Sequence, residues 1–255
     1  MIKLDKITAG YGDHMVLQAL SASFEKGSLI SIVGIKGCGK STLLKTILNM
    51  VPLQEGEVHI DGALLQSMGR KNIAQKVAYL SQEKRTPDMT VEQMVLHGRF
   101  PYLSYPRHYT AQDREIVKAA MEQTGVDAFA HKRLQTLSGG MRQDAYIAMA
   151  LAQSTDYILM DEPTTFLDIT HQLKLMKTLR NLADNGKGII TVMHDLPMAF
   201  TFSNKILLLH NGQVACYDTP QQICNRGILE EIFGVQIVQS EDGKSYHYQY
   251  DGMGK

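Results

Sequence analysis

The run Ser28-Leu29-Ile30-Ser31-Ile32-Val33-Gly34-Ile35-Lys36-Gly37-Cys38-Gly39-Lys40-Ser41-Thr42 decides the fold of this 255-residue chain. Its first six residues are uncharged and mostly apolar, which predicts a buried strand. Residues Gly34–Thr42 match the pattern G-x-x-x-x-G-K-[ST], and the apolar periodicity that follows predicts a helix over Lys40–Met50. A strand, a glycine-rich turn and a helix in this order are typical of a phosphate-binding loop. The order disfavours the alternative, a turn whose glycines serve packing alone.

Phosphate binding gives most residues of this loop a role. The glycines let backbone amides curl around phosphate oxygens, the ammonium group of Lys40 reaches the β and γ oxygens, and the hydroxyl of Ser41 can ligate Mg²⁺. The residues that we assign to nucleotide binding here are Gly34, Gly37, Cys38, Gly39, Lys40, Ser41 and Thr42.

The three cysteines, Cys38, Cys216 and Cys224, form no C-x-x-C pair and no even framework. This usage is typical of a reducing compartment. Cys38 lies at the predicted start of a helix, where a thiol pKa is expected to fall. We therefore expect oxidation or alkylation of Cys38 to block nucleotide binding.

A second glycine pair lies in the run Leu137-Ser138-Gly139-Gly140-Met141-Arg142-Gln143. A serine and two glycines before a helical run, predicted over Met141–Ala152, expose unpaired backbone amides at a positive helix end. That arrangement suits an anion, and phosphate in particular. The chain therefore has two candidate phosphate sites that are far apart in the sequence.

Two carboxylates follow the apolar run Tyr157–Met160, which predicts a strand. Ligands bind at the carboxyl ends of strands in open α/β sheets, and Asp161 and Glu162 occupy that place. Asp161 can hold Mg²⁺ through water, and Glu162 can orient and deprotonate an attacking water. The alternative, an acidic pair that caps a helix before Pro163, becomes minor beside a phosphate loop.

Three further residues follow or end predicted strands. His194 follows the strand predicted over Gly188–Met193 and can donate a hydrogen bond to a γ-phosphate oxygen. Gln82 closes the strand predicted over Val77–Leu80, where its amide can touch a Mg²⁺-bound water. Tyr11 can stack on an adenine. Spacing alone does not separate Gln82 or Tyr11 from ordinary polar and core residues.

The composition excludes some partners. The chain has 26 Lys and Arg residues and 26 Asp and Glu residues, so no overall field attracts nucleic acid or anionic lipid. The N-terminus has no apolar signal core, and no apolar run reaches the ~18 residues that a membrane span needs. We expect a cytoplasmic protein whose membrane role, if it has one, comes through a partner.

Short apolar runs alternate with amphipathic helices, which predicts a mostly parallel sheet covered by helices. Residues 87–153 break the alternation and predict an inserted helical segment, with one helix starting at a capping box, Thr110-x-x-Asp113. An Asn211-Gly212 turn predicts a β-hairpin over residues 205–217. We assign no chemistry to the polar tail, residues 240–255.

These motifs together resemble those of the ATP-binding subunits of ABC transporters, over nearly the whole chain. The motifs occur in that family's order: Tyr11, Gly34–Thr42, Gln82, Leu137–Gln143, Asp161-Glu162, Asp168 and His194. The resemblance implies an α/β fold with a P-loop NTPase (RecA-like) core. The core would have a mostly parallel sheet, an N-terminal antiparallel β part and an inserted α-helical subdomain. The implied domain spans residues 1–239, with its core at 1–86 and 154–239, the helical subdomain at 87–153, and a C-terminal extension at 240–255.

The resemblance also implies a mechanism. ATP and Mg²⁺ would be the cofactors, with Glu162, His194 and Gln82 catalytic, and Ser41, Gln82 and Asp161 near the metal. A second copy would pair head-to-tail, so that Ser138, Gly139 and Gly140 contact ATP held by the partner's loop and Asp168 communicates across the interface. The dimer would bind permease subunits at the cytoplasmic face of the membrane, and indirectly a substrate-binding protein, but no nucleic acid.

A finer resemblance is to importers of iron chelates (siderophores), haem or cobalamin. It is carried by His97-Gly98-Arg99-Phe100-Pro101-Tyr102, Thr110-x-x-Asp113, residues 121–125 and residues 147–153. It makes the loop Arg99–His108 the candidate permease-docking surface. The chain departs from the family pattern at Ile35, Lys36, Met141, Asp144 and Phe166, which leaves rates and dimer affinity open. The alternatives are an ATPase of a metal-ion transporter or an exporter, a soluble ABC ATPase that acts on nucleic acid or ribosomes, and a nucleotide switch without turnover.

Overall fold

The computed structural model describes residues 1–82 and 86–249. The chain forms two compact units, one made of Met1–Met68 with Lys177–Lys255 and the other of Gly69–Met176. We call them unit 1 and unit 2 and describe each by itself.

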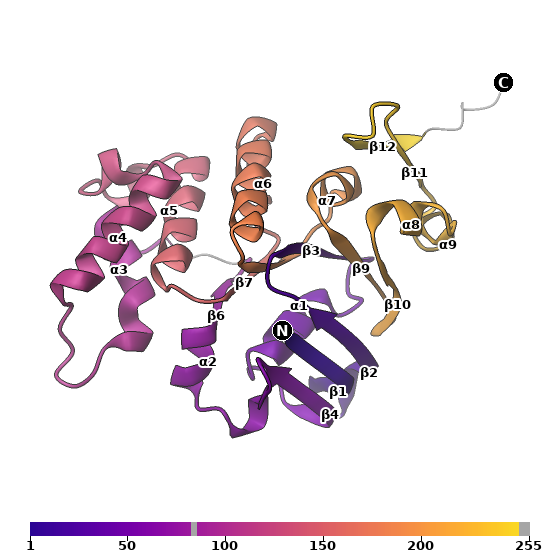
Figure 1. The fold of residues 1–255 in the computed structure, drawn as a ribbon, viewed down its shortest axis with the longest axis horizontal. Helices are drawn as coiled ribbons and strands as arrows, with labels where there is room; N and C mark the ends of the chain where they lie inside the picture. Colours follow the sequence, from indigo (N-terminus) through magenta and orange to yellow (C-terminus); the bar gives the residue numbers. More distant parts are fainter. Residues whose placement is uncertain (83–85, 250–255) are drawn as a thin grey trace. The chain divides into compact units, whose positions relative to one another are not determined.

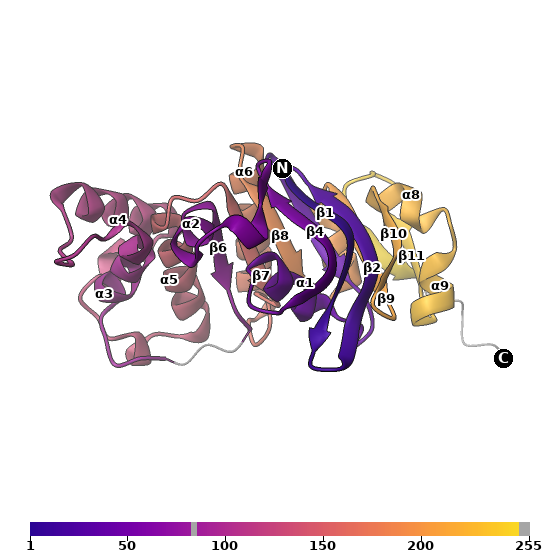
Figure 2. The same ribbon diagram turned by 90° about the horizontal axis from the view of Figure 1, so that it is seen from below.

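The N-terminal part of unit 1 is an antiparallel sheet with the strand order β2-β1-β4-β5. Its strands are β1 (Ile2–Tyr11), β2 (His14–Phe24), β4 (Leu53–Ile60) and β5 (Ala63–Leu64). Figure 2 shows β1, β2 and β4 side by side. Apolar side chains such as Ile2, Leu4 and Ile7 are fully buried on one face. This sheet confirms the predicted N-terminal antiparallel part.

The second sheet segment of unit 1 has the order β10-β9-β3-β8. Its strands are β3 (Ser28–Val33), β8 (Gly188–Val192), β9 (Lys205–His210) and β10 (Gln213–Asp218). The first three are parallel, and only β10 runs antiparallel (Figure 1). β10 forms the predicted hairpin with β9, and both turn residues, Asn211 and Gly212, have positive φ. This φ combination is typical of a two-residue hairpin turn.

Two helices of unit 1 follow these parallel strands. α1 (Lys40–Ile47) begins where β3 and the glycine-rich loop end. It is shorter than predicted, because Asn49 adopts a left-handed conformation with φ 55° before Pro52. α7 (Leu196–Phe202) follows β8, and the Asp195 carboxylate caps it by accepting a hydrogen bond from the Met198 amide at 2.8 Å.

The C-terminal part of unit 1 contains elements that the sequence analysis did not predict. They are α8 (Pro220–Cys224), α9 (Ile228–Phe233), β11 (Gln236–Gln239) and β12 (Tyr246–Gln249). β12 pairs antiparallel with β11 and packs on α7. The Tyr246 ring lies edge-on to Phe200 at 5.8 Å, and its amide donates to the Thr201 hydroxyl at 3.0 Å. Residues 240–249 of the predicted extension are thus folded, while residues 250–255 lie outside the described part.

Unit 2 combines a parallel strand pair with a group of helices. The pair is β6 (Val77–Leu80) and β7 (Tyr157–Asp161), in register from Val77 opposite Tyr157. The helices are α2 (Arg70–Lys76), α3 (Val91–Leu96), α4 (Ala111–Thr124), α5 (Gly139–Ala152) and the first half of α6 (Ile169–Asp184). A 3-10 segment, His97–Tyr102, follows α3. The predicted capping box of Thr110 and Asp113 is confirmed, with both reciprocal hydrogen bonds present.

Within the described residues, no helix is both long enough and apolar enough to cross a membrane.

Candidate functional site

The glycine-rich loop of unit 1 owes its shape to glycines at sterically restricted positions. Gly39, the residue before α1, has φ 107°, which strains any residue with a Cβ. A Cβ at Gly34 would lie 2.2 Å from the carbonyl oxygen of Leu209. Both positions therefore require glycine, and the loop runs directly from the buried strand β3 into the first turn of α1.

Lys40 points back into this loop. Its side chain is only 6% exposed, and Nζ donates to the carbonyl oxygens of Gly34 at 2.8 Å and Ile35 at 2.9 Å. Ser41 is half-buried beside it, and Thr42 is buried. A buried ammonium group and the backbone amides at the N-terminus of α1 form a cationic cradle that fits a polyphosphate.

The position of Cys38 predicted a lowered thiol pKa, and this prediction is wrong. The side chain is 5% exposed, and burial raises the pKa of the thiol despite the opposing influence of Lys40. Desolvation of the thiolate outweighs the nearby positive charge and the helix N-terminus. That oxidation or alkylation of Cys38 blocks nucleotide binding stays a prediction.

The turn between β9 and β10 is hydrogen-bonded to the glycine-rich loop. The amide of Gly212 donates to the carbonyl oxygen of Cys38 at 3.2 Å, and its own carbonyl accepts from the Gln18 amide at 3.0 Å. The sequence predicted the turn but carries no signal for this contact, because the two segments are more than 170 residues apart.

His194 follows β8 and is exposed, as is Tyr11 at the end of β1. His194 borders a cavity of about 810 Å³ together with the outer part of the glycine-rich loop and the C-terminal elements of unit 1. The residues that line it include Gly34, Ile35, Lys36, Leu196, Glu230, Phe233 and Tyr248. Unit 1 thus brings His194 and the loop to one cavity, as the strand-end argument predicted.

In unit 2, the two predicted carboxylates lie at the carboxyl end of β7. Asp161 is buried at 4% exposure as the last residue of the strand, and Glu162 follows with φ 51°. A positive φ at a non-glycine residue is a strained conformation of the kind that is concentrated at functional sites. Gln82 Nε2 donates to Glu162 Oε2 at 2.6 Å, and the Thr165 hydroxyl donates to the same oxygen at 3.3 Å. These two donors orient the carboxylate. The sequence analysis did not identify Thr165.

Glu162 and the start of α5 border one cavity of about 540 Å³. Its lining includes Gln82, Thr86, Gly139, Arg142, Tyr146, Glu162, Thr165 and Phe166. Burial raises the pKa of the Tyr146 phenol, so this side chain stays neutral. A carboxylate, two amide or hydroxyl donors and a guanidinium group around one cavity suit the activation of a water beside a phosphate.

The second glycine pair opens a helix, as predicted. α5 starts at Gly139, two residues earlier than expected, and the Ser138 hydroxyl accepts a hydrogen bond from the Met141 amide at 3.3 Å. Ser138 and Gly139 are exposed. The helix is 14 residues long, so its N-terminus has a full macrodipole.

The structure shows the surroundings of Asp144 and Phe166, two of the residues that depart from the family pattern. Asp144 on α5 forms an ion pair with Lys174 on α6, with Oδ2 and Nζ 2.7 Å apart, which explains an acidic residue at position 144. Phe166 is 98% exposed with φ 65°. Ile35 and Lys36 are exposed on the rim of the unit 1 cavity, and nothing in the structure explains these two substitutions or Met141.

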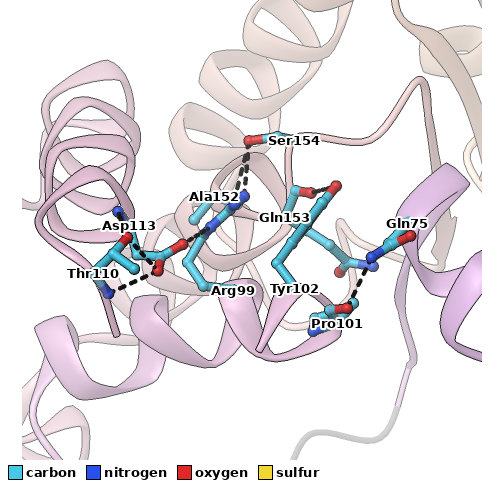
Figure 3. Close-up of polar contacts among 9 residues, drawn as sticks. All are labelled: Gln75, Arg99, Pro101, Tyr102, Thr110, Asp113, Ala152, Gln153 and Ser154. Carbon is cyan, nitrogen blue, oxygen red and sulfur yellow. Dashed lines mark hydrogen bonds and ion pairs between the residues drawn. The ribbon is translucent and has the colours of Figure 1, made fainter. Parts of the chain in front are cut away.

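Arg99, the first residue of the predicted docking loop, is in the interior instead (Figure 3). Its Nε donates to Asp113 Oδ1 at 2.8 Å, and its Nη1 donates to the carbonyl oxygen of Ala152 at 2.8 Å and the Ser154 hydroxyl at 3.2 Å. The guanidinium carbon also lies 4.0 Å from the centre of the Tyr102 ring. Arg99 is therefore a structural anchor. The exposed residues of the loop are Phe100, Ser104, Tyr105, Pro106, Arg107 and His108.

The chain thus has a glycine-rich loop between a buried strand and a helix, a carboxylate pair at the end of a second strand, and a serine-glycine turn that opens another helix. The sequence profile described as "ABC transporter" matches residues 17–165, more than half of the chain. The iron(3+)-hydroxamate import ATP-binding protein FhuC of Bacillus subtilis is 38% identical over 236 residues, 92% of this chain and 88% of the relative. The ferric enterobactin transport ATP-binding protein FepC of Escherichia coli is 36% identical over 240 residues, 93% of this chain and 89% of the relative.

Solved structures of ABC transporter cassettes have the same fold as this chain. An ATP-binding cassette of an ABC transporter in its ADP conformation superposes with a TM-score of 0.83 at 20% identity, covering 92% of this chain and 97% of that one. A dimeric bacterial ABC transporter cassette superposes with a TM-score of 0.74 at 28% identity, covering 86% and 99%. The chain belongs to the ABC transporter family. It is an ATP-binding subunit that hydrolyses ATP for transport, as the resemblance predicted.

Proposed function

We propose that this subunit powers the import of ferric siderophore complexes. The observation that carries the proposal is the similarity, over more than nine-tenths of the chain, to import proteins for iron(3+)-hydroxamate and petrobactin and to a ferric enterobactin transport protein. Identities of 35–38% support the transport class and leave the particular chelate open. Haem and cobalamin, which share the finer resemblance with siderophores, are alternatives that the uptake experiment described below separates from them.

Within this proposal, the residues of unit 1 bind the nucleotide. Tyr11 stacks on adenine, the loop amides and Lys40 bind the β- and γ-phosphates, and His194 donates to a γ-phosphate oxygen. Buried Lys40 and the shared cavity of His194 and the loop support these roles.

The residues of unit 2 carry out the hydrolytic step. Glu162 takes a proton from the attacking water, and Gln82 holds its carboxylate in place. Ser41, Gln82 and Asp161 would hold Mg²⁺, which neutralises charge on the phosphates. The donors fit this ion, because Mg²⁺ takes few protein carboxylates and many water and phosphate oxygens.

A second copy of the chain completes each ATP site in this proposal. ABC cassettes dimerise, as the dimeric structure at 28% identity illustrates. Ser138, Gly139 and Gly140 of one copy would contact the γ-phosphate on the loop of the other in a head-to-tail arrangement, with Asp168 at the interface. The exposed start of α5 supports this role. The dimer would act at the cytoplasmic face of the membrane, beneath permease subunits that receive the chelate from a substrate-binding protein.

Uptake by a strain that lacks this chain tests the solute. Radioactive iron supplied as a hydroxamate chelate, as a catecholate chelate or as haem, and labelled cobalamin, would be followed with the parent chain or with Glu162→Gln restored. We expect the parent chain to be required for uptake of a ferric siderophore and for none of the other solutes. The proposal would be contradicted if only the uptake of haem or cobalamin required the chain, or if the uptake of none of these solutes did.

Loss of the Lys40 ammonium group should weaken ATP binding. We expect Lys40→Ala to lower ATP affinity about ten- to a hundredfold, because a hydrogen bond to a charged group contributes about 1.5–3 kcal/mol. Calorimetric titration of the isolated chain with ATP and Mg²⁺ measures this change. Lys45→Ala, further along α1, is the matched control and should bind ATP normally.

Tyr105 should matter for coupling and not for hydrolysis itself. It is 96% exposed at the tip of the loop, so Tyr105→Ala leaves the fold intact. We expect transport to fall about tenfold or more, since truncation of a central interface aromatic typically costs about 2 kcal/mol. The ATPase rate of the isolated chain should stay unchanged. Met50→Ala, an exposed apolar residue of unit 1, is the control, and normal transport by Tyr105→Ala would exclude this loop as the docking surface.

A further inference from the structure

His171, on the first turn of α6, connects two motifs that the sequence analysis treated separately. Asp168 Oδ1 accepts a hydrogen bond from the His171 amide at 3.0 Å, and Asp168 Oδ2 lies 2.7 Å from His171 Nδ1. A carboxylate only accepts, so Nδ1 carries the proton. The His171 amide and ring together hold the pKa of the Asp168 carboxyl below its ordinary value. The carboxylate thus fixes both the tautomer and the ring orientation of His171.

The other face of this ring lies against the second glycine pair. A Cβ built on Gly140 would be 2.2 Å from His171 Cδ2 and 2.5 Å from Nε2, so the imidazole occupies the space of a side chain at position 140. Gly140 is buried in the first turn of α5, and its φ is not positive. The requirement for glycine here is therefore steric, and the neighbour that imposes it is His171.

One turn further along, a second tie joins the same two helices. Lys174, three residues after His171, pairs with Asp144, four residues after Gly140, at 2.7 Å. The beginnings of α5 and α6 are thus held together by a ring contact and an ion pair. The partly exposed ion pair contributes little by itself, so the oriented ring has the larger share in setting the position of the α5 N-terminus.

We propose that His171 is a positioning residue that clamps the Ser138–Gly140 turn to the Asp168 segment and so sets the geometry of the γ-phosphate half-site offered to a second copy of the chain. The inference rests on the proposed dimer. In this role His171 acts through the turn and does not itself contact the nucleotide. Its ring holds the α5 N-terminus in place, and Asp168 holds the ring.

The strength of the ATP-bound dimer tests this role. In the Glu162→Gln background, sedimentation velocity with ATP and Mg²⁺ measures the dimer dissociation constant. We expect His171→Ala to raise it about tenfold, which corresponds to about 1.4 kcal/mol. His171→Asn, which keeps a donor for Asp168 but not the ring, should recover only part of the loss. Lys177→Ala, an exposed position on α6, is the control and should leave the dissociation constant unchanged.

Two readouts separate positioning from a general loss of structure. The melting temperature of the nucleotide-free chain should change by less than about 3 °C with His171→Ala. Binding of a fluorescent ATP analogue to the monomer should not change. An unchanged dimer constant in His171→Ala would overturn the inference alone, whereas failure of Glu162→Gln itself to dimerise with ATP would overturn the proposed dimer.

The ring contact can also be tested without nucleotide. Gly140→Ala should lower the melting temperature in the parent chain, because the new methyl group meets the imidazole. In the His171→Ala background the same change should be nearly neutral, because the space is free. Equal destabilisation in both backgrounds would show that His171 does not set the glycine requirement, and the clamp would be rejected.

Discussion

Glu162→Gln should abolish steady-state ATP hydrolysis while ATP still binds. We expect turnover to fall about 10²–10⁴-fold, the range that a positioned general base contributes. The substitution keeps an oxygen that can accept from Gln82 and Thr165, so the local geometry survives and only the proton acceptor is lost. Phosphate release under saturating ATP measures the rate.

The same variant should accumulate as an ATP-bound dimer, if ATP closes the proposed dimer and hydrolysis reopens it, as the family resemblance implies. Gel filtration with and without ATP and Mg²⁺ would show the shift. Glu115→Gln, an exposed carboxylate on α4, is the control and should hydrolyse ATP at the parent rate. Turnover of Glu162→Gln above about a tenth of the parent rate would be incompatible with a general-base role of this size.

The parts of the site that sequence reasoning predicted well are local ones. The strand β3, the glycine-rich loop and α1 are consecutive in the chain, so their order and residue types specify the geometry directly. The same holds for the turn at Asn211-Gly212 and for the start of α5 after Ser138. In each case a short run of residues carries both the backbone preference and the chemistry.

The parts that it missed depend on tertiary burial. The helix N-terminus at Cys38 suggested a lowered thiol pKa, but burial raises it. Arg99 lies in a proline- and aromatic-rich loop that looked like surface, and only the packing of α4 and α5 around it buries the guanidinium group. The β11–β12 hairpin has a polar sequence, and it is stabilised by packing on α7 that no local pattern reports.

His171 is an intermediate case. A histidine three residues after an aspartate at the start of a helix is a readable local pair. Its contact with Gly140, 31 residues earlier in the chain, is not readable, because it depends on how α5 packs beside α6. The functional meaning of the local pair therefore becomes visible only with the fold.

Breaking the ion pair of Arg99 and Asp113 should destabilise unit 2 strongly. Both side chains are less than 10% exposed, and Asp113 also accepts from the Thr110 amide and hydroxyl at 2.9 and 2.8 Å (Figure 3). Removal of one partner leaves a buried charge uncompensated, which typically costs about 3–5 kcal/mol. We expect Arg99→Met to lower the free energy of unfolding by that amount, measured by urea denaturation.

Two matched variants separate the ion pair from ordinary packing. Arg99→Met combined with Asp113→Leu removes both charges and should recover part of the lost stability, because no unpaired charge remains. Glu122→Gln breaks the exposed pair with Lys118 on the same helix, α4, and should change stability by less than about 0.5 kcal/mol. An Arg99→Met variant as stable as the parent would show that the guanidinium group does not anchor the loop.

The pH dependence of this effect has a defined direction. Burial alone would raise the pKa of the Asp113 carboxyl, but the hydrogen bonds from Arg99 and Thr110 outweigh it and the pKa is lowered. A carboxyl whose pKa is lower in the folded state contributes stability that is fully present above its unfolded pKa of about 3.9 and is lost as the pH falls through its folded value. Arg99→Met leaves the Asp113 carboxyl buried without its cation, so the folded pKa of this carboxyl is higher in the variant than in the parent. The difference in stability between the two proteins should therefore be largest at neutral pH and shrink as the pH falls through these two folded pKa values. A difference that stayed constant into strong acid would have to come from another group, and the anchoring role of this pair would fail with it.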